Sequence, residues 1–340
     1  MQSTTVAVDL AKYVYQVSFA NRAGRVHTRK RLSRSQFERL IAREMPARFV
    51  MEACASAHHW ARVARQAGHE PVLLPAHHVR PYVRGNKTDS ADADALVRAA
   101  GDPSLHPVPV KSEELQALQA LVRVRQQLQN TRRARINLAR GLLTEFGIVL
   151  PRGARGIVPR LRQAVATAPM RLRATLDRVI DEIADLEARI DALGRELSEL
   201  GKERTDTARL MTLPGVGALT ATAFVGAIPN IHGFSNARQL SSWLGLTPRE
   251  HSSGNTRRLG AISKRGNVQL RTLLIHGARA ALLAARRRSS SCKPLTGLQQ
   301  WALQLQERAG HNKATVALAN RMARIIWAMW TREVDYDPTR

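Results

Sequence analysis

The sequence predicts a mixed α/β region at the N-terminus followed by a mainly helical remainder. Three observations predict this fold class. Short β-branched runs alternate with helical segments in the first third, a heptad repeat occupies the middle, and long amphipathic segments fill the last third. A chain of 340 residues with 44% hydrophobic residues is long enough for two or three domains with buried cores.

The N-terminal region should begin with a three-stranded antiparallel meander at 4–10, 13–19 and 25–30, with a turn from Asn21 to Gly24 before the third strand. The segments that follow should be a helix, a strand, a helix and a strand, at 35–43, 49–52, 57–67 and 71–74. This β-β-β-α-β-α-β order matches the ribonuclease-H-like layout.

The middle region should be helical. Apolar residues recur at helical spacing over 115–143 in an Arg- and Gln-rich context, and Pro151, Gly153 and Gly156 should end this helix. After a basic linker, eight apolar residues advance in steps of three and four, the pattern of a coiled coil. They are Leu176, Val179, Ile183, Leu186, Ile190, Leu193, Leu197 and Leu200. The helix at 115–143 could fold back onto this seam, or the seam could form a dimer arm; its unbroken length slightly favours self-association.

The last region opens at Leu213-Pro-Gly-Val-Gly217 and continues with an apolar helix. A basic, glycine-punctuated stretch at 260–271 precedes amphipathic helices at 269–287 and 313–331. The expected domains are therefore an α/β domain at 1–108, a helical spacer and oligomerisation region at 109–204, a mainly helical domain at 205–333, and a loose tail at 334–340.

The charge balance favours a polyanionic partner. The chain has 53 Lys and Arg residues against 27 Asp and Glu, a formal net charge of +26, and nucleic acid is the first candidate. With 4% aromatic residues, binding should be mainly electrostatic and salt-dependent. No apolar run is long enough to span a membrane and the N-terminus does not resemble a signal peptide, so we expect a soluble, cytoplasmic protein near the nucleoid.

Four carboxylates are candidate metal ligands: Asp9 near the end of the first strand, Glu52 at the end of an inner strand, and Asp89 and Asp92 at the start of a helix. Residues three apart share a helix face, so Asp89 and Asp92 can contact the same ions. Oxygen ligands suit Mg²⁺ or Mn²⁺, and two such ions can hold a phosphodiester. Taken singly, these residues also fit turns or a helix N-cap. Asp94 lies about half a helical turn from Asp92 and should face solvent or support the ligands from behind.

Several ordered motifs together resemble the DEDD-type insertion-sequence transposases, the bridge-RNA-guided recombinases, over nearly the whole chain. They are the Asp9 strand, Met51-Glu52-Ala53-Cys54, Asn86-Lys87-Thr88-Asp89-Ser90-Ala91-Asp92, Leu213-Pro-Gly-Val-Gly217, Trp243-Leu-Gly-Leu-Thr-Pro-Arg249, Ser252-Ser-Gly254 and Ile262-Ser-Lys-Arg-Gly-Asn267. One departure is that the family usually has glycine two or three residues after the ligand glutamate, where this chain has Ala53-Cys54-Ala55-Ser56.

The resemblance implies a RuvC-like metal domain, a helical spacer and a C-terminal transposase domain with a nucleophilic serine, which falls on Ser253. This serine would form a phosphoserine link to DNA while the metals act as Lewis acids. The resemblance also implies a homodimer or homotetramer with composite sites, and a noncoding RNA that pairs with donor and target DNA.

Without the resemblance, Ser253 would be read as a turn residue, and only the family pattern separates it from Ser252. Five basic neighbours could neutralise phosphate or form a general nucleic-acid-binding face, and the glycines of a helix-hairpin-helix-like element could present N–H groups to phosphate. These residues are Arg249, Arg257, Arg258, Lys264 and Arg265, with Gly215 and Gly217. Two rival functions stay open: a junction-resolving or ribonuclease-H-like nuclease that uses metal-activated water, and a non-enzymatic nucleic-acid-binding scaffold.

Overall fold

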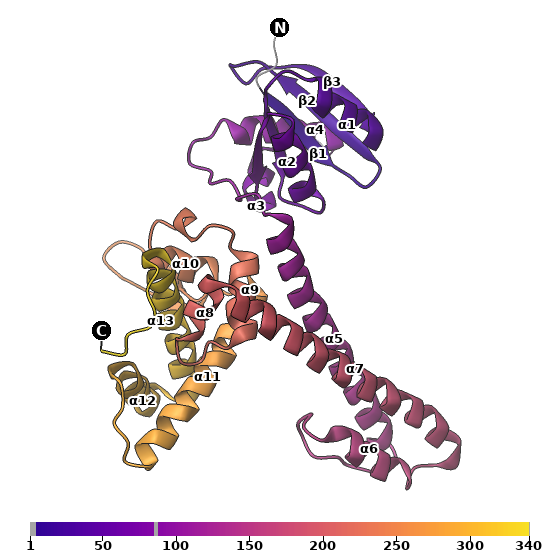
Figure 1. The fold of residues 1–340 in the computed structure, drawn as a ribbon, viewed down its shortest axis with the longest axis vertical. Helices are drawn as coiled ribbons and strands as arrows, with labels where there is room; N and C mark the ends of the chain where they lie inside the picture. Colours follow the sequence, from indigo (N-terminus) through magenta and orange to yellow (C-terminus); the bar gives the residue numbers. More distant parts are fainter. Residues whose placement is uncertain (1–4, 85–87, 340) are drawn as a thin grey trace. The chain divides into compact units, whose positions relative to one another are not determined.

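The structure, a computed structural model, describes residues 5–84 and 88–339. The chain forms two compact units, Met1–Glu113 and Glu114–Arg340 (Figure 1). The expected change from a mixed α/β N-terminal region to a helical remainder is confirmed. No helix in the described part of the chain is both long and apolar enough to cross a membrane.

A five-stranded sheet forms the centre of the N-terminal unit, in the order β3-β2-β1-β4-β5. Its strands are β1 (Thr5–Leu10), β2 (Val14–Ala20), β3 (Val26–Ser33), β4 (Arg48–Glu52) and β5 (Glu70–Leu74). The first three strands pair antiparallel, which confirms the predicted meander. Strands β4 and β5 join the other side of β1 in parallel.

Helices cover both faces of this sheet. They are α1 (Arg34–Arg43), α2 (Ala57–Gln66), α3 (Ala76–Val79), the 3₁₀ turn η1 (Arg80–Tyr82) and α4 (Asp89–Ala100). On one face, Tyr15, Phe37 and Trp60 stack closely between the sheet and helices α1 and α2. On the other face, Leu96 and neighbouring apolar residues of α4 pack against the sheet.

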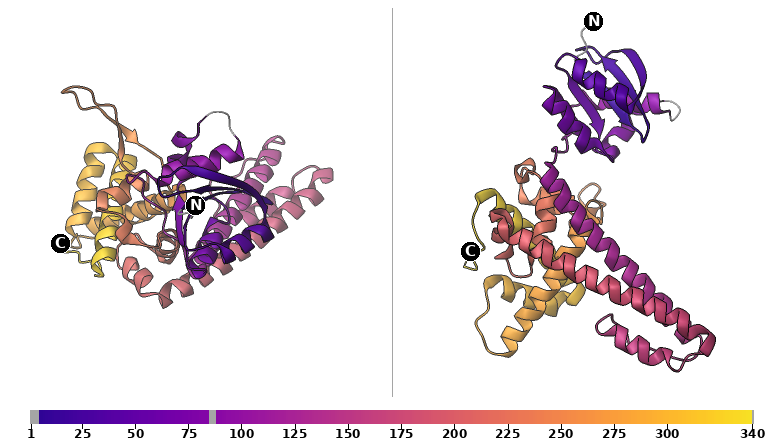
Figure 2. Two further views of the ribbon diagram at one scale, coloured as in Figure 1. Left: turned by 90° about the horizontal axis from the view of Figure 1, so that it is seen from above. Right: turned by 45° about the vertical axis from the view of Figure 1, so that its right-hand side comes forward.

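The middle region is an antiparallel helix pair within one chain, formed by α5 (Glu113–Thr144) and α7 (Met170–Glu203) (Figure 2). Two ion pairs show the direction, because Arg132 contacts Glu187 at 3.4 Å and the later Arg135 contacts the earlier Glu182. The heptad seam is covered by α5 and by α6 (Ile157–Val165), in the segment that we expected to be a linker. The slight preference for self-association through this seam is therefore wrong, because the chain supplies its own partner helices.

The C-terminal helices share a core with the end of α7. They are α8 (Thr205–Met211), α9 (Ala218–Ala227), the 3₁₀ turn η2 (Ile231–Gly233), α10 (Ala237–Trp243), α11 (Val268–Ser290), α12 (Gly297–Ala309) and α13 (His311–Arg332). Thr222 of α9 donates a hydrogen bond to the Leu197 carbonyl oxygen, and Gly201 lies against the Thr222 side chain. The expected boundary at 204 to 205 therefore runs through one compact unit.

Three further features differ from the sequence-based expectations. Strands β6 (Pro248–Glu250) and β7 (Leu259–Ile262) form an antiparallel hairpin, and α12 precedes the last helix. Tyr336, in the segment expected to be loose, packs against the helical core, and its backbone N–H donates to Thr212 Oγ1 at 2.9 Å. A half-buried aromatic ring is enough to hold this part of the tail.

The backbones of Gly215 and Gly277 cross closely between the α8–α9 turn and helix α11. A Cβ atom on Gly277 would lie 2.0 Å from the Gly215 carbonyl oxygen, and one on Gly215 would lie 2.5 Å from the Gly277 oxygen. Gly215 also has a positive φ of 93°. The Leu213–Gly217 element therefore needs glycine at 215 for packing, whether or not it contacts phosphate.

Gly277→Ala should lower the free energy of unfolding by about 1–3 kcal/mol, because the added methyl group overlaps a backbone oxygen that cannot rotate away. Gly141→Ala is the matched control, since it lies in α5 with no atom within 4 Å of the new Cβ. This control should gain about 0.5–1 kcal/mol from helix propensity. Chemical denaturation of both variants measures the difference, and equal effects would contradict the close crossing.

Candidate functional site

Asp9 and Glu52 are placed on one face of the sheet by the two-residue period of their strands. Ala7 and Val50 pack on the α4 side, whereas their sequence neighbours pack toward α1 and α2. Because side chains two apart in a strand point to the same face, Asp9 and Glu52 also face α4. Each lies one residue beyond the last position at which β1 and β4 pair with each other.

Asp92 brings a third carboxylate to this face from α4, which packs against β1, β2 and β4. Burial raises the pKa of Glu52, and the negative charge of Asp92 raises it further. Burial also raises the pKa of Cys54, with smaller contributions from Glu52 and Asp9. Asp92 therefore acts electrostatically on Glu52, and Glu52 and Asp9 both act on Cys54.

The side chain of Asp89 lies outside the described residues. The backbone of α4 begins at Asp89, and its N-cap is Thr88, whose hydroxyl accepts a hydrogen bond from the Ala91 N–H at 3.2 Å. The alternative that Asp89 is itself the N-cap is therefore wrong. Among the described side chains, a set without Asp89, no group of three His, Cys, Asp or Glu residues is arranged to hold a metal ion.

The donor set nevertheless fits a hard divalent cation. All of the candidate ligands are carboxylates, which suit Mg²⁺ or Mn²⁺. Glu52 and Asp92 repel each other while Glu52 is partly desolvated. A cation between them would remove this repulsion, and it would stabilise the ionised forms that ligation needs.

Asp94 has a different environment from Asp92, although it is only two residues further along α4. Its carboxylate accepts hydrogen bonds from Ser18 Oγ at 2.7 Å and from Arg29 Nη2 at 2.7 Å. Burial alone would raise the pKa of Asp94, but these two partners outweigh it and hold the pKa below its ordinary value. Asp94 therefore joins α4 to β2 and β3, and it is not the solvent-facing residue that one alternative expected.

Ser253 lies in the exposed turn of the β6–β7 hairpin. Its backbone N–H and carbonyl oxygen pair with those of Thr256 at 3.2 and 3.1 Å, so the main chain is held while the side chain projects. The Ser253 hydroxyl makes no hydrogen bond to any residue that the structure describes. Gly254 follows with a positive φ of 56°, which turns the chain back toward β7.

The neighbouring Ser252 is engaged within the hairpin. Its hydroxyl donates to Glu250 Oε1 at 2.7 Å and accepts from the Arg258 N–H at 3.2 Å. Glu250 also forms an ion pair with Arg257 at 3.4 Å. The hydrogen bond from Ser252, followed by the charge of Arg257, lowers the pKa of Glu250. Local geometry therefore separates the two serines, which sequence reasoning could separate only by family pattern.

The segments around Gly245 and Gly266 cross at the base of this hairpin, where their backbones are in close contact. A Cβ atom on Gly245 would lie 1.9 Å from the Arg265 oxygen, and one on Gly266 would lie 1.9 Å from the Trp243 oxygen. Arg271 is buried behind them and donates to the Leu244 oxygen at 2.8 Å and to the Arg265 oxygen at 3.2 Å. This structural role of Arg271 was missed, and its only signal in the sequence is an arginine on the apolar face of a helix.

The basic residues predicted around the serine are all exposed, on the hairpin or at its base. They are Arg249, Arg257, Arg258, Lys264 and Arg265. Arg249 donates to the Ser263 oxygen and Arg257 pairs with Glu250, which leaves their guanidinium groups near the surface of the hairpin. Gly217 is exposed at the N-cap of α9.

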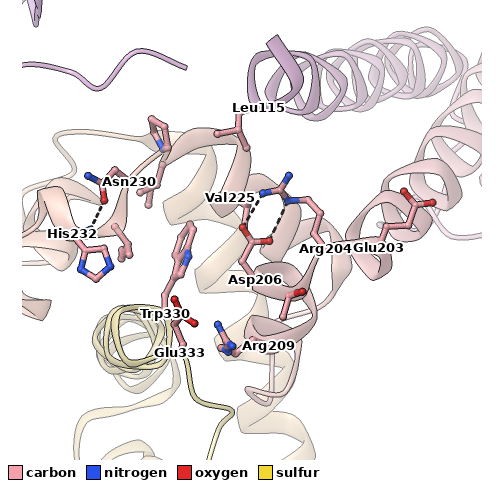
Figure 3. A pocket seen from close by; sticks show the side chains of 14 residues that line it. Leu115, Glu203, Arg204, Asp206, Arg209, Val225, Asn230, His232, Trp330 and Glu333 are labelled. Atoms are coloured by element: carbon pink, nitrogen blue, oxygen red, sulfur yellow. Dashed lines mark hydrogen bonds and ion pairs between the residues drawn. The ribbon is translucent and has the colours of Figure 1, made fainter. Parts of the chain in front are cut away.

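A separate cavity of about 720 Å³ lies among α8, α9 and α13 in the C-terminal unit (Figure 3). Arg204 pairs there with Asp206 at 3.0 Å and also with Glu114. Asn230 caps the following turn by accepting from the His232 N–H at 2.9 Å. None of the predicted site residues that the structure describes lines this cavity, and its Arg204 is neutralised internally, so it is not the candidate site.

Comparison with known proteins identifies two matching family models. The model described as the transposase IS116/IS110/IS902 family matches residues 207–292. A model of DEDD transposases of IS110 type, described as transposase, matches residues 6–148. The first range contains Ser253, and the second contains the four candidate carboxylates.

Relatives that match nearly the whole chain are also named as transposases. A probable family 20 transposase of Pseudomonas aeruginosa PAO1 is 40% identical over 343 residues, covering 99% of this chain and 100% of the relative. The Coxiella burnetii transposase for insertion sequence element IS1111A is 41% identical, covering 97% of this chain and 90% of the relative. The Yersinia enterocolitica transposase for element IS1328 is 34% identical, covering 97% of both chains.

Ser56 adopts a left-handed conformation, with φ 67°, four residues after Glu52. It precedes α2 but its side chain does not cap the helix, so no side-chain hydrogen bond compensates for the strain. Ser56→Gly should therefore raise the free energy of unfolding by about 0.5–1 kcal/mol. Ser35→Gly, within α1, should lower it by about 0.5 kcal/mol. Thermal and chemical denaturation test the opposite signs, and a loss of stability in Ser56→Gly would contradict the strain.

Proposed function

The chain belongs to the IS110/IS116 family of DEDD transposases, and we propose that it cleaves and exchanges DNA strands through a phosphoserine intermediate on Ser253. The observation that carries this proposal is the difference between the two adjacent serines. Ser252 is engaged with Glu250, whereas the exposed Ser253 hydroxyl has no partner among the described residues.

The serine chemistry conserves the energy of the phosphodiester bond, so that strands can be rejoined. Ser253 Oγ attacks the phosphorus of a DNA phosphodiester, loses its proton to solvent or a base, and displaces one strand end as a free hydroxyl. Attack by the hydroxyl of another strand then reverses the step, forms the new phosphodiester and returns the proton to the serine. The exposed cations Arg258, Lys264 and Arg265 near the hairpin would offset the charge of the phosphate under attack.

The carboxylates of the N-terminal unit would hold the divalent metals. Asp9 and Glu52 contribute from β1 and β4, and Asp92 contributes from α4, with Asp89 as the fourth proposed ligand. Bound Mg²⁺ or Mn²⁺ would act as a Lewis acid on the phosphodiester under attack. The strand order β3-β2-β1-β4-β5, with its antiparallel meander and two parallel strands, supports a RuvC-like assignment for residues 1–108.

The remaining parts of the proposal rest on the family resemblance and on charge. The formal net charge of +26 supports binding to the element ends and the target DNA. Guidance by a noncoding bridge RNA and assembly as a homodimer or homotetramer are proposed from the resemblance. Because the seam of α7 is already covered within the chain, such an assembly would have to use other surfaces.

Ser253→Ala should abolish both strand cleavage and the covalent protein–DNA adduct, a loss of about 10³-fold or more, because the adjacent hydroxyl of Ser252 is held by Glu250. Ser252→Ala is the matched control and should keep the adduct. The measurement is denaturing electrophoresis of protein with labelled element-end DNA, guide RNA and Mg²⁺. Cleavage by Ser253→Ala without any adduct would instead support a nuclease that uses metal-activated water.

Asp92→Asn should weaken Mn²⁺ binding by about 10-fold or more, because it removes a charged ligand from the carboxylate set. Asp94→Asn is the control on the same helix, and it should retain metal binding because Asp94 is occupied by Arg29. Calorimetric titration of the folded proteins without DNA compares the two. Equal metal affinities would contradict a ligand role for Asp92, and nucleic-acid binding without any cleavage by the unsubstituted protein would support the non-enzymatic scaffold alternative.

A further inference from the structure

A second basic feature lies in the C-terminal unit, away from the β6–β7 hairpin in sequence. Helix α5, the 153–154 loop and the start of α11 line a cleft of about 420 Å³. Four arginines and His276 line it, and no lining residue carries a carboxylate. The arginines are Arg125, Arg132, Arg133 and Arg140.

Three of these arginines carry buried donors without a partner. The Nε atoms of Arg125, Arg132 and Arg140 are buried and make no hydrogen bond to any described residue. Buried polar atoms in native proteins almost always have a partner, so the guanidinium groups along this cleft have donor capacity that the described part of the chain does not satisfy. Arginine Nε and Nη donors together match the oxygens of a phosphate group.

The protein itself neutralises only part of this charge. Arg132 pairs with Glu187 at 3.4 Å, and Arg140 donates to the Pro151 oxygen at 2.6 Å. Burial lowers the pKa of Arg125, the charge of Asp191 opposes this effect, and the charge of Arg132 adds to it. The Arg125 side chain donates no hydrogen bond to any residue that the structure describes. Arg133 is exposed and likewise has neither an ion pair nor a hydrogen bond to the described residues.

The length of the cleft favours a chain of anions over a single ion. Arg125 and Arg140 are fifteen residues apart on one helix, which corresponds to about 22 Å along its axis. Successive phosphates of a nucleic acid strand can occupy such a row, whereas one free phosphate would contact only one or two of its arginines. Gln129 of α5 and His276 of α11 add further hydrogen-bonding groups to the lining of the cleft.

We propose that this cleft binds the sugar–phosphate backbone of a nucleic acid strand, at a site distinct from the Ser253 hairpin. Binding there needs neither the serine nor the carboxylates, so the site positions nucleic acid on the helical unit and takes no part in bond cleavage. The contacts go to phosphate, so binding should depend on salt and only weakly on sequence.

The test compares two double variants that remove the same charge. Arg125→Gln with Arg133→Gln changes the cleft, and Arg123→Gln with Arg189→Gln changes exposed arginines of the same helix pair that do not line it. Fluorescence anisotropy follows binding of one labelled sequence as single-stranded RNA, single-stranded DNA and duplex DNA, with a chelator present so that no cleavage occurs. Titrations between about 50 and 200 mM salt give the slope of log K against log salt.

The cleft variant should lose about 1.4 from the magnitude of this slope for a single strand, or about 1.8 for a duplex, as expected for two phosphate contacts. The control variant should lose less than half as much. The probe with the largest difference between the two variants identifies whether RNA or DNA occupies the cleft. Equal losses in both variants would show only an effect of overall charge and would overturn the proposal.

Two further measurements separate binding from folding. The melting temperature of the free cleft variant should be equal to or higher than that of the wild type, because the unpartnered buried donor of Arg125 is removed. Arg125→Lys with Arg133→Lys should restore most of the slope. If the Lys and Gln variants lose equal affinity and both melt lower, the arginines are structural and the proposal is wrong. An acidic peptide that binds with the same dependence on Arg125 and Arg133 would also overturn it, in favour of a protein partner.

Discussion

An excess of cations over anions constrains this whole molecule. The chain has 53 Lys and Arg residues but 27 Asp and Glu residues, so at most 27 of these cations can each pair with a separate side-chain carboxylate. The carboxylates of α7 are used to neutralise arginines of α5, as in the pair of Arg132 and Glu187, and Arg271 is satisfied by carbonyl oxygens instead. In this setting, a partly buried carboxylate whose pKa is raised by another carboxylate is unusual. Glu52 is such a residue, because burial and Asp92 both act on it in the same direction.

The sequence predicted the N-terminal fold well because short runs of consecutive buried apolar residues mark its inner strands. Strands β1 and β4 begin and end within one residue of their expected bounds, since buried β-branched residues mark each of them. The β6–β7 hairpin was missed because both of its faces are exposed and no apolar alternation marks its strands. Helix α6 has buried residues at Ile157, Leu161 and Val165, which are four residues apart. This spacing indicates a helix only if the preceding Gly156 is taken as the start of a new helix and not as part of a linker.

The period of an apolar helix seam predicts that another helix covers the seam, but it does not identify that helix. The seam of α7 is satisfied by α5 and α6, and this outcome depended on a turn after Thr144 that periodicity cannot place. The face shared by Asp9 and Glu52 followed from strand parity, so this part of the candidate site was predictable. The partners of Asp94, by contrast, come from β2 and β3, and no spacing rule connects them to α4. The difference between Ser252 and Ser253 likewise depends on where Glu250 points across a turn.

The base and the tip of the β6–β7 hairpin are under different structural constraints. Gly245 and Gly266 hold the base through main-chain crossings that admit no side chain. Every residue from 251 to 260 is exposed, and none belongs to a hydrophobic core. Substitutions around Ser253 therefore change the free energy of folding little, as is usual for exposed turns. Residues around the serine can therefore be exchanged during evolution with little loss of folding stability. The two glycines at the base tolerate almost no other residue.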